Sequence, residues 1–81
     1  MSELVLHTVG IDEFEAMRLC DHEGMSQIEA AAQMQVSRGT VQRLLEKGRK
    51  TLLEAIITNG ALGIADDTVV EGERVKMAGD L

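Results

Sequence analysis

The 81-residue sequence has no proline, no tryptophan and no tyrosine, and it contains a single phenylalanine. A hydrophobic core must therefore be built from leucine, isoleucine, valine, methionine and alanine. The chain is long enough for one small domain, which buries a limited share of its surface and gains stability from helix packing or self-association. We therefore expect residues 1–81 to form a single domain.

The sequence also lacks the features of exported and membrane proteins. Its one cysteine, Cys20, excludes a disulfide within the chain, and a reducing, cytoplasmic setting is the simplest interpretation. The first ten residues have neither a basic leader nor a long apolar run, so they do not resemble a signal peptide. No segment approaches the ~20 apolar residues of a membrane span. We expect a soluble, cytoplasmic protein with no membrane partner.

Positive charge is scarce, and most of it lies in one segment. The net charge is −6, from 8 basic and 14 acidic residues. Residues 38–50 hold five of the basic residues and one acid, which gives +4, and the other residues together carry −10. This distribution places one basic element on an acidic body, so the net charge does not exclude a polyanionic partner.

The first half of the chain contains the signals of a strand and two helices. Residues 4–9 are apolar and alternate in the manner of a short strand. The first helix begins after Gly10 with acids in its first turns, and Gly24 is placed to end it. Ser26 and Glu29 form a capping box that starts a second helix. In the first helix the expected apolar stripe is Phe14, Met17 and Cys20, with Ala16 and Leu19 beside it. In the second helix it is Ile28, Ala31 and Ala32.

A third helix is predicted from residue 38 to residue 58, with Ser37 before it and Asn59-Gly60 after it. Only a three-to-four-residue turn separates it from the second helix, so the two must cross steeply. The small Ala31 permits this close crossing, Val36 should fill the core at the turn, and Val41 and Leu44 should anchor the third helix. This is the spacing of a helix-turn-helix. Gln35 occupies the position that requires a positive φ, at a cost of about 1 kcal/mol.

The C-terminal part is predicted to contain short β structure. Residues 61–72 contain two apolar pieces that form either a hairpin or one strand paired with residues 4–9, and residues 73–81 look frayed. The predicted fold is mainly α, with a three-helix helix-turn-helix core at residues 11–58 flanked by short β segments. We expect the apolar strands to pair within or between subunits, and a homodimer is the resulting hypothesis.

The polar face of the third helix predicts binding to double-stranded DNA. At 100° per residue, its basic and amide side chains lie opposite the apolar stripe. Arginine suits guanine edges and phosphates, glutamine suits adenine, and short hydroxyls at a helix start suit a phosphate. The function expected from this face is sequence-specific reading of the major groove by helix 38–58. The candidate DNA-binding residues are Ser37, Arg38, Gly39, Thr40, Gln42, Arg43, Lys47, Arg49 and Lys50.

Other functions find less support in the sequence. Cys20 and His22 are two residues apart on a helix, so they point about 200° apart and do not share a metal; Cys20 is expected to be a small core residue. No phosphate-binding loop or nucleophile–base pair is present, so we expect neither an enzyme nor a cofactor. Arg18 and Glu23 are expected to form internal ion pairs that orient the first helix against the second. The alternative function is a protein-interaction module that binds RNA polymerase or a sigma factor without contacting DNA.

Residues 11–65 resemble a family of uncharacterised bacterial and archaeal proteins that are predicted to bind DNA. The resemblance implies a helix-turn-helix similar to region four of sigma factors, a role in transcriptional regulation, and a DNA-reading helix that includes Ser37, Arg38, Thr40, Gln42 and Arg43. The chain departs from the family pattern at Gln35, where glycine is common, and at Gly39, where proline is usual; the longer N-terminal segment of many members is not in this sequence. The matching pieces are Asp12-Glu13, Glu15-Ala16, Arg18-Leu19, Glu23-Gly24, Ser26-Gln27, Val36-Ser37-Arg38 and Gln42-Arg43-Leu44-Leu45.

Overall fold

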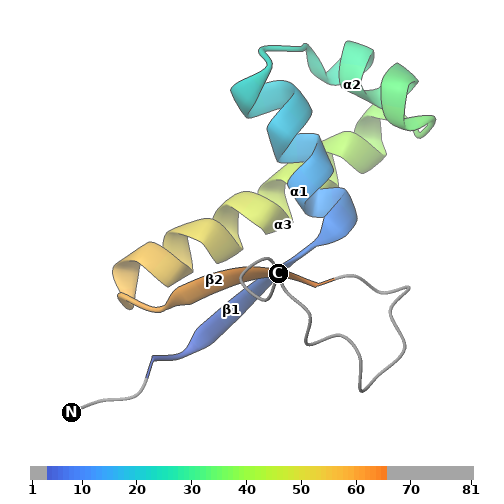
Figure 1. Ribbon diagram of the computed structural model, residues 1–81. Coiled ribbons are helices and arrows are strands. Elements are labelled where there is room, and N and C mark those ends of the chain that lie inside the picture. The colour runs from blue at the N-terminus through green and yellow to red at the C-terminus, as the bar shows by residue number, and fades with distance from the viewer. Residues whose placement is uncertain (1–3, 66–81) are drawn as a thin grey trace, which may run out of the picture.

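The computed structural model describes residues 4–65, whose arrangement is shown in Figure 1. Three helices and a two-stranded sheet make up this part of the chain, which confirms the predicted mainly α class with short β segments. The predictions for residues 66–72 and for the tail at 73–81 lie outside the described residues. In chain order the elements are β1 Leu6–Gly10, α1 Ile11–Met17, the π-helical turn η1 Arg18–His22, α2 Gln27–Met34, α3 Arg38–Ile57 and β2 Ala61–Ala65.

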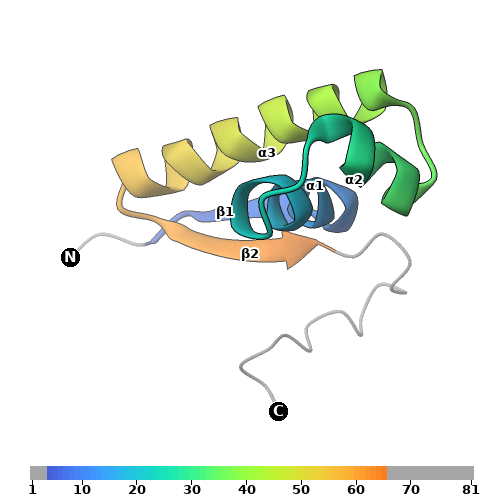
Figure 2. The ribbon, with the colours of Figure 1, turned by 90° about the horizontal axis from the view of Figure 1, so that it is seen from above.

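The two strands pair in parallel, with Leu6 opposite Ala61 and Gly10 opposite Ala65. All three helices therefore form the crossover between the strands, and α3 runs alongside the sheet in both views (Figures 1 and 2). A hydrogen bond of 2.9 Å from the Ala61 N–H to the Val5 carbonyl extends the pairing beyond β1. Residues 61–65 therefore form the pairing with the N-terminal strand that the sequence left open, and the alternative hairpin with residues 66–72 lies outside the described residues.

The core lies where α1, α2 and α3 meet. The predicted close contact at Ala31 is confirmed, since this residue is 6% exposed. The predicted stripe of α2 was wrong at Ile28 and Ala32, which are exposed, and Ala30 is buried instead. Because α3 passes close over α2, the contact is made by side chains that end at Cβ, and the larger isoleucine lies outside it. The buried cluster consists of Ala16, Leu19, Ala30, Ala31, Val41 and Leu45.

The first helix packs most of its predicted apolar residues against the core, including Met17 and Cys20, and of the five only Phe14 is exposed. Phe14 is 39% exposed, whereas Ala16 and Leu19 are almost completely buried. The helix lies so close to α3 that a Cβ atom on Gly48 would be 2.9 Å from the terminal methyl group of Met17. Because α1 and α3 are this close, the small Ala16 fits at the centre of their contact. The larger ring of Phe14 lies at the edge of the contact.

The first helical segment ends in a left-handed residue after the π-helical turn. The Glu23 N–H donates to the Arg18 carbonyl at 2.9 Å, and the Met25 N–H donates to the Leu19 carbonyl at 3.0 Å. Gly24 lies between these two donors with a φ of +82°. The prediction that Gly24 ends this helix is therefore confirmed.

Three residues, 35 to 37, join α2 to α3. Gln35 has a φ of 63° and a ψ of 44°, which confirms the predicted left-handed conformation. The Val36 N–H donates to the Ala31 carbonyl at 3.0 Å, but the valine side chain is 38% exposed. The prediction that Val36 fills the core was therefore wrong, because its backbone rather than its side chain is held against α2. At the other end of α3, Asn59 adopts the left-handed conformation, with a φ of 58°.

Candidate nucleic-acid interface

The candidate interface begins at the first turn of α3. The Thr40 N–H donates to the Ser37 Oγ at 3.1 Å, and the two hydroxyl oxygens are 3.0 Å apart. No acidic residue lies in this first turn, whereas α1 has Asp12 and Glu13 there and α2 has Glu29. The partial positive charge at the start of α3 is therefore not offset by an adjacent carboxylate, and this turn is the one suited to a phosphate.

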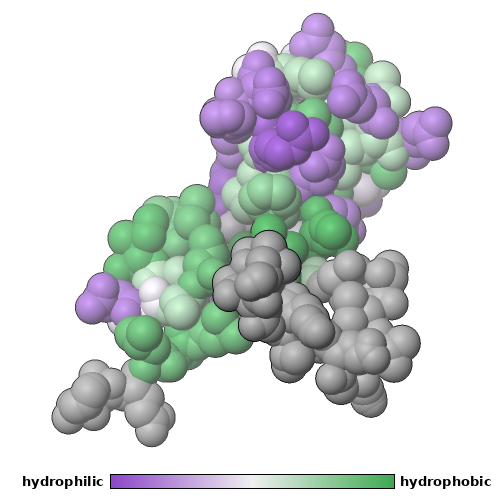
Figure 3. Space-filling model, in the orientation of Figure 1, coloured by the Kyte–Doolittle hydropathy of each residue, from purple (hydrophilic) through white to green (hydrophobic). Residues whose placement is uncertain are grey.

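The predicted polar face of α3 is in solvent. Arg38, Gln42, Arg43 and Lys50 are exposed, while the opposite face of the helix supplies buried side chains of the core. Hydrophilic residues gather over the end of the molecule that holds α2 and the start of α3 (Figure 3). Of the other predicted residues, Ser37, Lys47 and Arg49 are exposed, and Gly39 and Thr40 are half-buried.

Two guanidinium groups at the start of α3 are oriented by neutral acceptors. Arg38 donates from Nη1 to the Gln27 Oε1 at 3.1 Å, and Arg43 donates from Nη2 to the Thr40 Oγ1 at 3.4 Å. Neither bond neutralises the charge, and within residues 4–65 the other N–H groups of each guanidinium form no hydrogen bond. Gln27 is a member of this site that the sequence analysis did not assign. Its position directly after the Ser26 cap, facing the turn, is the signal that could have identified it.

Lys47 lies on one flank of the polar face, near the buried end of an acid. Its Nζ is 3.6 Å from Oε2 of Glu13, a residue that is 7% exposed. The other oxygen of this carboxylate accepts the Gly10 N–H at 3.0 Å. The open cleft of about 560 Å³ beside this flank is lined by Glu13 and Asp12 as well as by Arg43 and Lys47, so its charge is mixed. Lys47 is therefore a cation with an internal partner, although its side chain is 76% exposed.

Arg49 lies on the opposite flank, where it forms a bidentate ion pair. Its Nε and Nη2 donate to the two carboxylate oxygens of Asp21 at 3.1 and 2.7 Å. This hydrogen bonding raises the pKa of the Arg49 guanidinium. The pair joins the middle of α3 to η1 across 28 residues of sequence. Asp21 is the partner that sequence reasoning missed, because no short-range pattern connects the two positions.

The remaining cations of the face have no such partner. In residues 4–65, Arg38, Arg43 and Lys50 take part in no ion pair within 4 Å. They occupy the first three to four turns of α3, with Glu46 as the one acid among them. The positive charge of the face is therefore strongest at the start of α3, next to the turn that lacks an acid.

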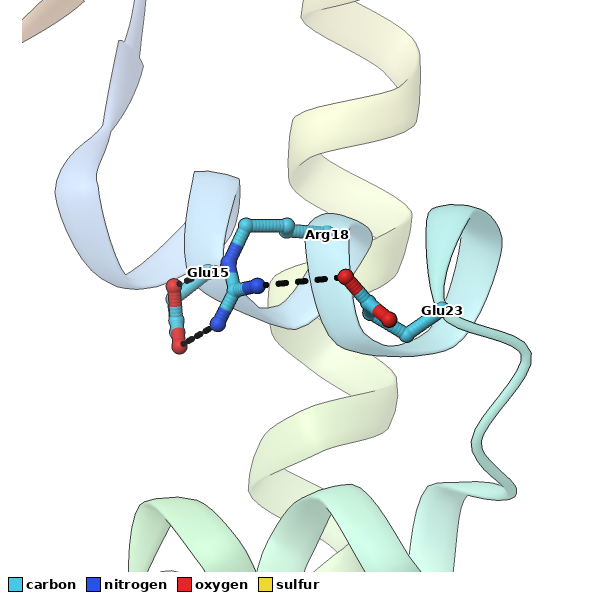
Figure 4. A network of polar contacts seen from close by, with 3 residues as sticks. All are labelled: Glu15, Arg18 and Glu23. Carbon is cyan, nitrogen blue, oxygen red and sulfur yellow. Dashed lines mark hydrogen bonds and ion pairs between the residues drawn. The ribbon is translucent and has the colours of Figure 1, made fainter.

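Arg18 confirms the expectation of internal ion pairing, with one correction. It pairs with Glu15 at 2.8 Å and with Glu23 at 3.5 Å (Figure 4). The hydrogen bond from Arg18 holds the pKa of Glu15 below its usual value and raises that of the guanidinium. Glu15 lies in α1 and Glu23 directly follows η1, so both ion pairs lie within the first helical segment. They stabilise that segment and do not orient it against α2.

Other reactive groups are dispersed. Cys20 is partly buried against the core, as predicted, and burial raises the pKa of its thiol. Within residues 4–65, His, Cys, Asp and Glu side chains form no group of three that could hold a metal ion. No helix in this part of the chain is long and apolar enough to cross a membrane.

The comparisons with known proteins place the chain among uncharacterised relatives. The family described as "Protein of unknown function DUF134" matches residues 3–79. A UPF0251 protein of Chlorobium chlorochromatii is 46% identical over 68 residues, which cover 84% of this chain and 37% of the relative. A UPF0251 protein of Methanosarcina mazei is 41% identical over 81 residues, which cover 98% of this chain and 48% of the relative.

The relatives are longer than this chain. A UPF0251 protein of Caldicellulosiruptor saccharolyticus, 44% identical over 66 residues, is covered over 48% of its length and covers 82% of this chain. The chain thus spans about half the length, or less, of the curated relatives it matches. No solved structure matches it significantly.

Proposed function

Because this chain belongs to the family of proteins of unknown function DUF134, we propose a function from its charged face: sequence-specific binding of double-stranded DNA in transcriptional regulation. The observation that carries the proposal is the exposure of Arg38, Gln42 and Arg43 beside a helix start that has no acid. In this proposal α2, the turn and α3 act as a helix-turn-helix similar to region four of sigma factors. A cytoplasmic location follows from this function.

The dimensions and chemistry of α3 suit the major groove. An α-helix with its side chains is about 10–12 Å wide, and the groove is about 12 Å wide. Arg43 and Gln42 would read base edges, since arginine pairs with guanine and glutamine with adenine. Arg38, held by Gln27, and the Ser37–Thr40 turn would contact the phosphates that flank those bases. The backbone of Gly39 carries no side chain there, so DNA could approach it closely.

The three other predicted contacts differ in their support. Lys50 is exposed and has no ion pair among residues 4–65, so it remains in the proposed set as a phosphate contact. Lys47 also remains in the proposed set, but its contribution to DNA binding should be smaller, because its Nζ lies 3.6 Å from Oε2 of Glu13. Arg49 is left out of the set, because Asp21 already binds its guanidinium in two places. The resulting interface is centred on the first half of α3.

The test begins with selection of bound duplexes from a random pool, followed by affinity measurements on the recovered sequence at several salt concentrations. Arg43→Ala should weaken specific binding about 10- to 100-fold and relax the base preference at one position. Lys50→Ala should weaken binding to all sequences alike and reduce the salt slope by about one. The matched control is Arg49→Ala, which removes the same charge from the same helix and should leave the base preference unchanged.

The proposal fails if no sequence is enriched, or if Arg43→Ala and Lys50→Ala bind as the unaltered chain does. An equal loss of base preference in Arg49→Ala would place the interface on the other flank of α3. Circular dichroism of each variant separates loss of binding from loss of folding.

The second candidate is a protein-interaction module, with RNA polymerase or a sigma factor as its partner. It is favoured by the exposed apolar residues at the far end of the molecule, among them Ile56, Ile57 and Ile64, which are 52–77% exposed. Binding to purified polymerase that persists in Arg43→Ala, together with no selection of DNA, would favour this function. Loss of DNA selection without polymerase binding would support neither candidate.

A further inference from the structure

Among residues 4–65, the end of the molecule opposite the basic face exposes an apolar surface. Hydrophobic residues gather there over the sheet and the second half of α3 (Figure 3). Its large side chains are each 46–77% exposed, and residues 51–57 of α3 include a single charged residue, Glu54. Monomeric soluble proteins rarely expose continuous apolar patches larger than about a few hundred Å², so an apolar surface that spans a strand and a helix is suited to an interface. The patch consists of Leu53, Ile56, Ile57, Leu62 and Ile64.

Within the described residues, strand β2 adds an unpaired backbone edge to this patch. Among residues 4–65 it pairs with β1 alone, so one of its two edges has no partner strand there. Its sequence, Ala-Leu-Gly-Ile-Ala, contains no charge and no proline, the features that normally protect an edge from pairing with another chain. Leu62 and Ile64 alternate with smaller residues, so both project from the same face of the strand.

We propose that β2 pairs antiparallel with β2 of a second copy, about a two-fold axis through Gly63, to form a four-stranded sheet. An isologous interface requires a surface that is complementary to itself. Strand β2 meets this condition, because pairing about Gly63 places Leu62 opposite the partner's Ile64 and Ala61 opposite the partner's Ala65. Each half-exposed aliphatic side chain of β2 would then contact one of similar size.

The charge of the chain does not oppose a contact between two copies at this strand. Each copy carries a net charge of −6, but the β2 strand that would form the contact carries none, so pairing brings no like charges together across the strands. A strongly charged partner would find no complementary group on β2. The basic faces lie at the other end of α3 in each copy and remain accessible in this dimer. The inference rests on the apolar end alone, so it stands whether or not the proposed DNA binding is correct.

The first test measures the mass of the 81-residue chain in solution by light scattering and sedimentation, without DNA. We expect twice the monomer mass of 8.8 kDa at micromolar concentration. Ile64→Lys should raise the dimer dissociation constant about 100-fold, because each dimer loses two buried isoleucines and gains charge at the edge. Ile28→Lys is the matched control, since Ile28 is 68% exposed on α2, outside the patch, and its replacement should leave the mass unchanged.

The second test fixes the register and does not depend on weakening the dimer. In a Cys20→Ser background, Gly63→Cys should form an intermolecular disulfide, because residues opposite each other in an antiparallel pair have Cα atoms about 4.5–5.5 Å apart. A Cβ atom on Gly63 would meet only the Leu6 Cδ1, at 3.6 Å, so the substitution fits the monomer. Ala61→Cys in the same background should not cross-link, because its counterpart lies four residues away along the pair, about 13 Å.

The outcomes decide the proposal. A monomer that persists to the highest soluble concentration would overturn it, and would leave residues 66–81 or another protein as the occupant of the patch. A dimer that is unaffected by Ile64→Lys, or that cross-links through residue 61 and not residue 63, would place the contact elsewhere. Dimerisation lost in Ile64→Lys, kept in Ile28→Lys and trapped at residue 63 would establish it, whatever the DNA-binding assay shows.

Discussion

The two halves of α3 differ in chemistry although they belong to one uninterrupted helix. Residues 38–50 carry five cations and one acid, whereas residues 51–57 carry one acid and no cation. Both halves share a buried stripe, but the first exposes arginine, glutamine and lysine, and the second exposes Leu53, Ile56 and Ile57. A 20-residue helix is about 30 Å long, enough to separate two surfaces completely. One structural element can therefore serve a polyanionic partner at one end and an apolar partner at the other.

The largest effect on stability should come from Leu45→Ala, because Leu45 lies in the core that connects the two ends of the molecule. Leu45 is 1% exposed and lies midway along α3. Its truncation should lower the free energy of unfolding by about 2–5 kcal/mol, from lost burial and the cavity left behind. Hydrogen exchange should show that the strands and α2 lose protection together, if the ends are one cooperative unit.

Leu53→Ala is the matched control for that measurement, because it truncates a leucine two turns further along α3 that is 56% exposed. Its effect on unfolding should stay within about 0.5 kcal/mol. If Leu45→Ala left the strand end protected while α2 opened, the two ends would be separate folding units.

The second prediction contrasts two glycines at opposite ends of α3. A Cβ atom on Gly60 would lie 2.5 Å from the Val5 carbonyl oxygen, next to the hydrogen bond that joins the strands, so Gly60→Ala should cost about 1–3 kcal/mol. At Gly39 the nearest atoms would be 3.8 and 3.9 Å away, and Gly39→Ala should be neutral or stabilising by up to about 1 kcal/mol. Chemical denaturation of both variants measures the difference. Equal effects would mean that the strand end is not held as closely as its geometry indicates.

The same division explains how much could be predicted from the sequence. At the basic end the signals are local: Ser26 with Glu29, Ser37 before the third helix, and Gln35 in the turn all adopt the predicted roles. Each depends on residues within four positions, where spacing alone determines the geometry. The helices, their order and the exposed cations of α3 were therefore accessible from the sequence.

What the sequence could not decide depends on contacts distant in the chain. The pairing of β1 with β2 joins residues about 55 positions apart, and two arrangements were compatible with the pattern. The ion pair between Asp21 and Arg49 joins two helical segments with no shared motif. The exposure of Phe14 and Ile28 follows from how closely the helices approach, which depends on Gly48 and the alanines of α2. Periodicity predicts that a helix has an apolar face, but the fit against its neighbour decides which residues fill it.

The third prediction compares the N-cap residues of α2 and α3, Ser26 and Ser37, which should contribute equally to stability but differently to DNA binding. Ser26→Ala and Ser37→Ala each remove a hydrogen bond of 3.0–3.1 Å to a helix N–H, so each should cost about 1 kcal/mol. Only Ser37 belongs to the proposed DNA interface. Under conditions where both variants are folded, Ser37→Ala should weaken DNA binding and Ser26→Ala should not. Equal weakening would show that the caps act through stability alone.

The smallest effect should come from Arg18, in the helical segment that lies between the two ends. The folded-state pKa of Glu15 is lowered, chiefly by its hydrogen bond from Arg18. A lowered folded-state pKa means that the pair stabilises the fold above the unfolded-state pKa and loses this contribution as the pH falls through the folded-state value. At neutral pH the melting temperature of the unaltered chain should therefore be slightly higher than that of Arg18→Gln. This difference in melting temperature should disappear as the pH falls below 4.5, the usual pKa of a glutamate. The effect is small because both side chains are more than a third exposed. A gap that persists in acid would instead assign the role of Arg18 to the packing of its aliphatic stem, because protonation of Glu15 removes only the ionic part.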